Sequence, residues 1–304
     1  MPATKLRIAL DWTPNTIHSG LYLAKEKGYY KEHNLEVELL PPDAKYSKTP
    51  AKRLEAGEVD LAICPSESCI AYNETAKMQL QAIYAILQKD ASAIVGTKLN
   101  SMRELGDGKK KYGSYNARYE DSIVKAMVGK DGGEGHNVHI ESSEGKLSMF
   151  DAVKAGRIDA TWIFLPWEGV EAELEGVHTK HFKLEDYDIP YGYSPVISRN
   201  VAKSPSDEVL QAFVSATRQG YEHAIKHPHD VTDILHQVTV PQRSKDFLHK
   251  SQASINHYYS DGHKPGFMDS TKWTTWLQWL RAHKLLNGLR DVKEEDIFTN
   301  QFAR

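Results

Sequence analysis

Aromatic, amide, carboxylate and imidazole side chains gather in one short segment near the start of the chain. The apolar stretch 6–10 predicts a strand, and Asp11, Trp12, Asn15 and His18 follow it directly. In an open parallel sheet, ligands bind at the carboxyl ends of the strands, so these side chains are placed for recognition. Each also has a structural interpretation: Asp11 as a residue that fixes the turn, Trp12 as a packing aromatic, Asn15 as an Asx turn and His18 as a contact at a helix N-terminus.

Signatures of common enzymes and of metal sites are missing. The sequence has no GxSxG elbow, Walker A loop, HExxH or CxxC motif, which disfavours the usual hydrolases and kinases. His223 and His227 have the spacing of a helical ligand pair, but Pro228 follows and no carboxylate supports them, so a solvated helix end is predicted. Cys64 and Cys69 are too few for a tetrahedral zinc site and a poor disulfide framework, so cysteine usage favours a reducing compartment.

The elements that position these residues alternate between strands and helices. The length of 304 residues, with 40% hydrophobic and 26% charged side chains, suits a globular protein with two domains. Such alternation is typical of an α/β fold with parallel strands. We expect strands at 6–10, 36–40 and 59–63 and helices at 20–27 and 49–56. From Ser204 onwards the pattern is mostly helical, with helices at 206–227 and 271–286, and we expect this tail to pack on the first domain.

One local pattern occurs twice, about a hundred residues apart. The stretch 55–62 (Glu-Ala-Gly-Glu-Val-Asp-Leu-Ala) resembles the stretch 154–161 (Lys-Ala-Gly-Arg-Ile-Asp-Ala-Thr). Both indicate a helix that ends at a glycine, followed by a strand bearing an aspartate. We interpret the pair as one strand-entry turn used once in each domain; the alternative is chance similarity of a common junction.

Charge and hydropathy limit the partners. Lys and Arg total 38 against 41 Asp and Glu, and the one basic run, 109–111, is interpreted as a solvated turn, so a nucleic-acid partner is not expected. The mean hydropathy is −0.54, and no stretch approaches the roughly 20 apolar residues of a membrane span. The N-terminus shows no signal peptide. We therefore expect a cytoplasmic protein if the chain is complete, and a periplasmic or cell-surface protein if a signal has been removed.

The opening segment resembles a known family. Residues 11–30 are similar to the opening of the thiamine-pyrimidine group of substrate-binding proteins, which has a formylaminopyrimidine-binding branch and a fungal pyrimidine synthase branch. Further matches lie at 56–60, 112–120, 162–171, 186–187 and 193–196. The resemblance implies the type II periplasmic-binding-protein fold, with two α/β lobes closing on a ligand between them: lobe 1 at 1–95 and 195–304, including the mostly helical C-terminal tail, and lobe 2 at 96–194.

The implied ligand is a thiamine-related aminopyrimidine of the formylaminopyrimidine or hydroxymethylpyrimidine type, taken up or salvaged, with an ABC transporter as partner if the protein is exported. Such a flat ring needs aromatic faces, for which Trp12 with either Trp167 or Tyr193 are the candidates, and a carboxylate that accepts hydrogen bonds. Glu168 is the candidate carboxylate, although it also suits a helix N-terminus. The loop 113–116 is expected to offer free N–H groups, with Arg118 adding charge, unless it is a plain connection. The predicted ligand-binding residues are Asp11, Trp12, Asn15, His18, Ser66, Glu67, Tyr115, Asn116, Trp162, Trp167, Glu168 and Tyr193.

The sequence departs from the synthase branch. The resemblance would place a lysine holding pyridoxal phosphate and a histidine near the strand after Asp60, and a cysteine-rich iron segment later. No Lys or His stands between Leu61 and Tyr72, and the stretch 191–196 has no cysteine. A Schiff base needs an amine nucleophile. We therefore predict a binding protein without catalytic residues, metal ligands or cofactor; pyridoxal phosphate and iron belong only to the alternative, a pyrimidine synthase.

Overall fold

The computed structural model describes residues 2–142, 149–288 and 290–303, and the chain divides into two compact units. Unit 1 comprises Met1–Asp90 and Gly192–Arg304, and unit 2 comprises Ala91–Tyr191. The chain therefore passes from one unit to the other twice. Within the described residues each unit has its own sheet of five strands, which confirms the predicted α/β class.

The sheet of unit 1 has the strand order β2-β1-β3-β10-β4. Its strands are β1 (Thr4–Ala9), β2 (Leu35–Leu40), β3 (Leu61–Cys64), β4 (Leu80–Ala85) and β10 (Val196–Asn200). Strand β1 pairs in parallel with β2 and β3, whereas β10 runs antiparallel to β3 and β4. The alternating sequence of β2 buries every second side chain, and the wholly apolar β3 is buried along its length.

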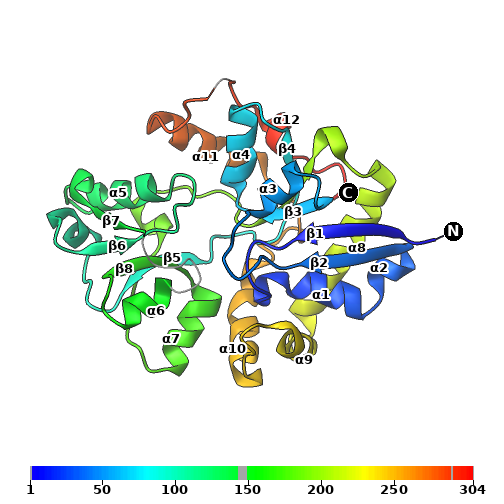
Figure 1. Cartoon of the computed structure of the whole chain (residues 1–304), viewed down its shortest axis with the longest axis horizontal. Coiled ribbons are helices and arrows are strands. Elements are labelled where there is room, and N and C mark those ends of the chain that lie inside the picture. Colours follow the sequence, from blue (N-terminus) through cyan, green and yellow to red (C-terminus); the bar gives the residue numbers. More distant parts are fainter. Residues whose placement is uncertain (1, 143–148, 289, 304) are drawn as a thin grey trace. The chain divides into compact units, whose positions relative to one another are not determined.

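Helices cover both faces of this sheet. Figure 1 shows α1 and α2 on one side of β1 and β2, with α3 and α4 on the other. The helices of unit 1 are α1 (Ser19–Glu26), α2 (Tyr29–Glu32), α3 (Pro50–Glu55), α4 (Ser66–Glu74), α8 (Asp207–Lys226), α9 (His229–Val238), α10 (Lys245–Ile255), α11 (Ser270–Ala282) and α12 (Glu294–Ile297), with 3-10 turns η1 (Thr16–His18), η7 (Val201–Lys203) and η8 (Asn256–Tyr258).

The C-terminal helices pack onto the N-terminal ones, as predicted for the tail. Helix α8 crosses α1 at Gly220 and Gly20. The two backbones are so close there that a Cβ on Gly220 would lie 2.0 Å from the carbonyl oxygen of Gly20. The hydroxyl of Tyr221 donates to the Ile17 carbonyl at 2.7 Å. The tail is therefore part of the core that supports η1 and α1.

The sheet of unit 2 has the strand order β7-β6-β8-β5-β9. Its strands are β5 (Ser92–Gly96), β6 (Lys111–Gly113), β7 (His139–Glu141), β8 (Ala160–Phe164) and β9 (Lys180–Phe182). Its helices are α5 (Glu120–Lys130), α6 (Met149–Lys154) and α7 (Val170–Leu174), with short turns η2 (Met102–Asp107), η3 (Gly135–Asn137), η5 (Leu165–Gly169) and η6 (Leu184–Tyr187). Figure 1 shows α5 on one face of this sheet and α6 with α7 on the other.

The repeated sequence pattern forms the same strand-entry turn in both units, which confirms that interpretation. Gly57 and Gly156 both adopt positive φ, +74° and +71°. The Asp60 carboxylate accepts the N–H of Arg7 at 2.8 Å, and the Asp159 carboxylate accepts the N–H of Lys111 at the same distance. Each aspartate thus fixes the register between a strand and its parallel neighbour, β1 with β3 and β6 with β8.

We expect Gly57→Ala and Gly156→Ala each to lower the free energy of unfolding by about 1–2 kcal/mol, because an L side chain is strained in the left-handed region. A Cβ added at either glycine would meet nothing within 4 Å, so the loss comes from backbone strain alone. Urea denaturation measures it. Gly57→Asn is the matched control and should lose less, since Asn tolerates this conformation; equal losses for Ala and Asn would contradict the backbone explanation.

No helix among the described residues is long and apolar enough to cross a membrane.

Candidate functional site

Seven of the predicted site residues lie at one edge of the sheet of unit 1. Strands β1 and β3 are parallel neighbours, so their carboxyl ends share an edge. The loop after β1 carries Asp11, Trp12, Asn15 and His18, and the start of α4 after β3 carries Ser66 and Glu67. Strand β10 runs the other way, so Tyr193, which precedes it, lies at the same edge.

His18 forms a hydrogen bond with one of the two carboxylate oxygens of Asp11. The buried His18 ring places Nε2 2.8 Å from Asp11 Oδ1, while its Nδ1 lies 3.3 Å from the N–H of Asn15. Because Nδ1 accepts from a backbone donor, the neutral ring carries its proton on Nε2 and donates it to Asp11. Asp11 Oδ2 has no hydrogen-bond partner among the described residues, and the side chain is 18% exposed. Asp11 is thus a fixed acceptor that is partly exposed to solvent.

Asn15 and His18 have structural roles, as their structural interpretations predicted. Asn15 Oδ1 accepts from the N–H of Ile17 at 2.7 Å, and its Nδ2 donates to the Thr13 carbonyl at 2.9 Å. Both ring nitrogens of His18 are engaged within the loop. Helix α10 of the C-terminal tail also contacts η1, because Ser251 Oγ lies 2.8 Å from Thr16 Oγ1. Asn15 and His18 therefore position Asp11 and Trp12.

Trp12 forms an aromatic wall with a residue that the sequence reasoning missed. The half-buried Trp12 ring lies 5.7 Å from the Tyr46 ring, at an angle of 48°. The Tyr46 hydroxyl donates to the Asp11 carbonyl at 2.6 Å, and burial raises the pKa of this phenol. Tyr46 follows β2, and the rule used for β1, that loops after parallel strands share an edge, would have identified it.

Ser66, Glu67 and Tyr193 are buried and contact their own unit. Ser66 Oγ donates to Glu67 Oε2 at 3.2 Å, and the Ser66 N–H donates to the Tyr193 carbonyl at 3.1 Å. The Tyr193 hydroxyl accepts from the N–H of Asp269 at 2.7 Å, and its ring lies 5.9 Å from that of Trp273. Burial raises the pKa of Tyr193 to about 12. These contacts support the edge and do not single out Tyr193 as a stacking face.

The other five predicted residues lie at one edge of the sheet of unit 2. Strands β6 and β8 are parallel neighbours, and β6 ends at Gly113, opposite Thr161. Tyr115 and Asn116 therefore follow β6 at the edge where Trp162 continues β8 beyond its neighbour. Trp167 and Glu168 lie in η5, directly after β8.

An aromatic ring and a carboxylate are again both partly exposed at this edge. The Trp162 ring lies 5.4 Å from that of Tyr191, tilted by 56°. Glu168 Oε2 accepts the N–H of Phe164 at 3.0 Å, so this carboxylate also closes the turn after β8. Trp167 is buried. The pKa of the Tyr115 phenol is raised well above its usual value. Burial is the largest cause, followed by the negative charges of Glu168 and Glu120.

The loop after β6 does not offer the free N–H groups that the sequence predicted. Glu120 Oε1 accepts the N–H of Tyr115 at 3.1 Å, and Oε2 accepts the N–H of Ala117 at 3.0 Å. Ser114 Oγ accepts the N–H of Asn116 at 3.0 Å. The prediction of free amides at 113–116 is wrong for Tyr115 and Asn116, whose N–H groups already donate to nearby side chains, and for Ser114, whose N–H donates to the Glu141 carbonyl at 2.9 Å.

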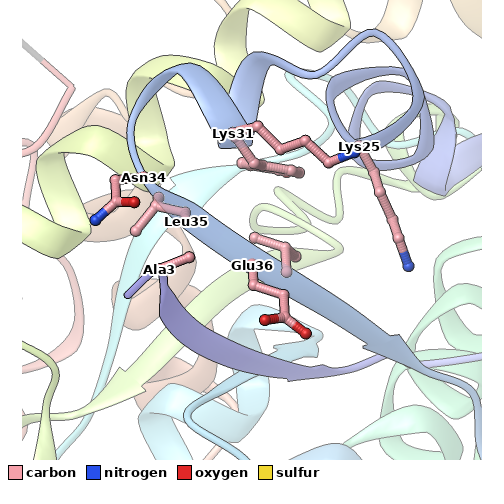
Figure 2. Close-up of a pocket in the computed structure, with 8 residues that line it drawn as sticks. Ala3, Lys25, Lys31, Asn34, Leu35 and Glu36 are labelled. Carbon is pink, nitrogen blue, oxygen red and sulfur yellow. The ribbon is translucent and has the colours of Figure 1, made fainter. Parts of the chain in front are cut away.

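Unit 1 also has a pocket away from the sheet edge that carries its own candidate residues, and Figure 2 shows this pocket with its lining residues. Its volume is about 400 Å³, and it opens beside the amino end of β2, whereas the candidate residues follow carboxyl ends. Its labelled lining residues are Ala3, Lys25, Lys31, Asn34, Leu35 and Glu36. It therefore does not include any predicted site residue.

The described residues contain no group of three or more His, Cys, Asp or Glu side chains arranged to hold a metal ion. His223, from the predicted helix end, instead pairs with Asp230 at 2.8 Å and with the Tyr29 hydroxyl at 2.9 Å. Its ring lies 4.9 Å from that of His227.

The fold is that of the periplasmic binding proteins. The zinc-bound ligand-binding component of an ABC-type import system from Staphylococcus aureus superposes with a TM-score of 0.73 at 16% identity, covering 98% of this chain and 97% of that one. The chain belongs to the family described as NMT1/THI5 like, which matches residues 15–231.

Two sequence relatives carry names from thiamine metabolism. The formylaminopyrimidine-binding protein of Halalkalibacterium halodurans is 25% identical over 310 residues, which span 97% of this chain and 89% of the relative. A putative thiamine biosynthesis protein of Haemophilus influenzae is 28% identical over 229 residues, spanning 74% of this chain and 71% of the relative.

Pyridoxal phosphate, which the synthase alternative requires, does not fit the residues present. The end of β3 and the start of α4 read Cys64, Pro65, Ser66 and Glu67, with no amine for a Schiff base. In unit 2, the loop amides suited to a phosphate are filled by Glu120 and Ser114.

Proposed function

We propose that this protein binds a thiamine-related aminopyrimidine, of the formylaminopyrimidine or hydroxymethylpyrimidine type, and that the edges of both sheets take part in binding. The observation that carries the proposal is the repeated pairing of a partly exposed aromatic ring with a partly exposed carboxylate: Trp12 with Asp11, and Trp162 with Glu168. An aminopyrimidine has a flat π-face and an exocyclic NH₂, so it matches a ring and an acceptor. The formylaminopyrimidine-binding relative, aligned over 97% of this chain, supports that ligand class.

The predicted site residues form two groups, those proposed to contact the ligand and those proposed to position the contacting residues. Asp11, Trp12, Tyr115, Asn116, Trp162 and Glu168 are partly or fully exposed and are proposed to touch the ligand. The buried Asn15, His18, Ser66, Glu67, Trp167 and Tyr193 are proposed to hold them in place. Capture then needs no bond to break, and the site binds its ligand reversibly. A periplasmic or cell-surface location with an ABC transporter as partner suits uptake, and a cytoplasmic one suits salvage.

A thermal-shift panel tests the ligand class. We expect hydroxymethylpyrimidine or formylaminopyrimidine to stabilise the protein by about 2.7 kcal/mol at 100 times the dissociation constant, which raises the melting temperature by several degrees. Thiamine, riboflavin and pyridoxal phosphate are the comparison compounds. No shift with either pyrimidine contradicts the proposal, and a shift with pyridoxal phosphate alone favours the synthase alternative.

Glu168→Gln tests the carboxylate of unit 2. We expect the variant to fold normally, because the Gln carbonyl still accepts the N–H of Phe164. Pyrimidine binding should weaken by about 1–3 kcal/mol, since the lost acceptor carried a charge and the new NH₂ opposes the ligand's own donor. Calorimetric titration measures it. Glu185→Gln, which removes a charge from a 76% exposed side chain of the same unit, is the control; equal dissociation constants for Glu168→Gln and the control would remove Glu168 from the site.

A further inference from the structure

The carboxylate of Glu120 occupies the position in the loop after β6 where two backbone amides converge. Residues 114–119 leave the carboxyl edge of the sheet, and two of their amides point at one place. Glu120 fills it: the N–H groups of Tyr115 and Ala117 and the hydroxyl of Tyr112, 2.8 Å away, all donate to its two oxygens. The side chain is only 2% exposed.

A carboxylate with three donors resembles an oxyanion seated in a nest of backbone amides. The donors that would compensate the charge of a bound phosphate are therefore already engaged. Two further carboxylates lie near this loop. Asp121 Oδ1 accepts from Ser114 Oγ at 2.6 Å, and the charge of Glu168, like that of Glu120, raises the pKa of the Tyr115 phenol. A phosphate brought to this edge meets like charges instead of donors, which opposes its binding.

Arg118 is the nearby cation that could act in the opposite sense. Its guanidinium lies 5.3 Å from the centre of the Tyr119 ring, and the side chain is exposed. An exposed cation is screened by water and salt, whereas the Glu120 charge is buried next to the filled amides. The buried charge is therefore expected to decide the preference.

We propose that Glu120 is a specificity-determining residue that excludes phosphorylated ligands, so that the site takes the uncharged pyrimidine alcohol or amine and rejects its phosphate ester. The identity of the ligand rests on the proposed function, whereas the filled amide nest does not.

Two ligands that differ only in the phosphate test this on the unmodified protein. We expect the dissociation constant of hydroxymethylpyrimidine phosphate to exceed that of hydroxymethylpyrimidine by about 100-fold at low salt. In Glu120→Gln, the ratio should fall to about 10-fold while the alcohol binds as before, because the charge is gone, the shape is kept, and only the hydrogen bond from the Ala117 N–H is lost. Glu185→Gln should leave the ratio unchanged. Equal affinity of the unmodified protein for alcohol and ester overturns the proposal and assigns the counter-charge to Arg118.

Inorganic phosphate provides a test that needs no pyrimidine. In Glu120→Ala the nest is open, and we expect phosphate at about ten times its dissociation constant to raise the melting temperature by about 3 °C relative to chloride at equal ionic strength. The unmodified protein and Glu185→Ala should show no such gain. A gain in the unmodified protein would mean that the nest accepts anions and would overturn the proposal. If Glu120→Ala does not fold, the alcohol-to-ester ratio of the unmodified protein decides. Failure of both pyrimidines to bind contradicts the proposed function alone, because the phosphate experiment still decides the role of Glu120.

Discussion

Asp11→Asn is expected to weaken aminopyrimidine binding about 100-fold, or about 2.7 kcal/mol, without unfolding the protein. The reason lies in the fixed proton of His18. Its Nδ1 faces the N–H of Asn15, so its Nε2 must donate, and Asn can meet that donor only with its carbonyl oxygen. The Asn NH₂ then points where the free Asp11 oxygen was and opposes the ligand's amino group. Turning the amide over would place two donors face to face inside the loop.

Another His–Asp pair in the same unit provides the matched control. Asp230 in α9 also accepts from a histidine, His223, at 2.8 Å, but it lies in a C-terminal helix far along the chain from the β1 loop. Asp230→Asn should leave the dissociation constant unchanged. Calorimetric titration of both variants, with melting temperatures to verify folding, measures the difference. An affinity within twofold of the unmodified protein for Asp11→Asn would show that its free oxygen does not contact the ligand.

The fold could be predicted in detail because local and long-range signals agree. In each unit a glycine, Gly57 or Gly156, ends a helix, and an aspartate, Asp60 or Asp159, joins the next strand to its neighbour. Both features lie within one short stretch of sequence, so the pattern alone identifies them. The apolar residues of the helical tail recur at regular spacing, and that face is buried against the N-terminal part of the same unit.

The site was predicted as a set of positions, but not by the role of each residue. Ligands bind at the carboxyl ends of strands in open α/β sheets, and this rule predicted the sheet edge in each unit. The rule does not predict which polar side chains are already hydrogen-bonded inside the protein. His18 and Asn15 are engaged by their own loop. Glu120 fills two amides of the loop before it, and in this loop Asn116 and Tyr119 adopt positive φ. Asparagine is enriched in that conformation, but the residue type gives no sign of it at Tyr119.

Gly220→Ala is expected to have the largest effect on stability, a loss of about 3 kcal/mol or more in the free energy of unfolding. A Cβ at this position would lie 2.0 Å from the carbonyl oxygen of Gly20 and 3.0 Å from the Cβ of Ala24. The first of these atoms is backbone inside α1, so no side-chain rotation relieves the overlap. Helices α1 and α8 would have to move apart. Helix α2 is also joined to α8, by a hydrogen bond of 2.9 Å between Tyr30 Oη and Thr217 Oγ1.

Separation of α1 and α8 would also disturb the loop after β1, which carries Asp11 and Trp12. Helix α1 begins directly after His18, and the hydroxyl of Tyr221, the neighbour of Gly220, donates to the Ile17 carbonyl. We therefore expect a fall of about 6–12 °C in the melting temperature and weaker ligand binding by the folded variant. Gly129→Ala is the control: its Cβ would meet nothing within 4 Å in α5, and Ala favours a helix, so stability should be unchanged or higher by up to about 1 kcal/mol. A loss below 1 kcal/mol for Gly220→Ala would mean that α1 and α8 separate at little cost, and the edge would then owe its geometry to Ser251 and the other α10 contacts instead.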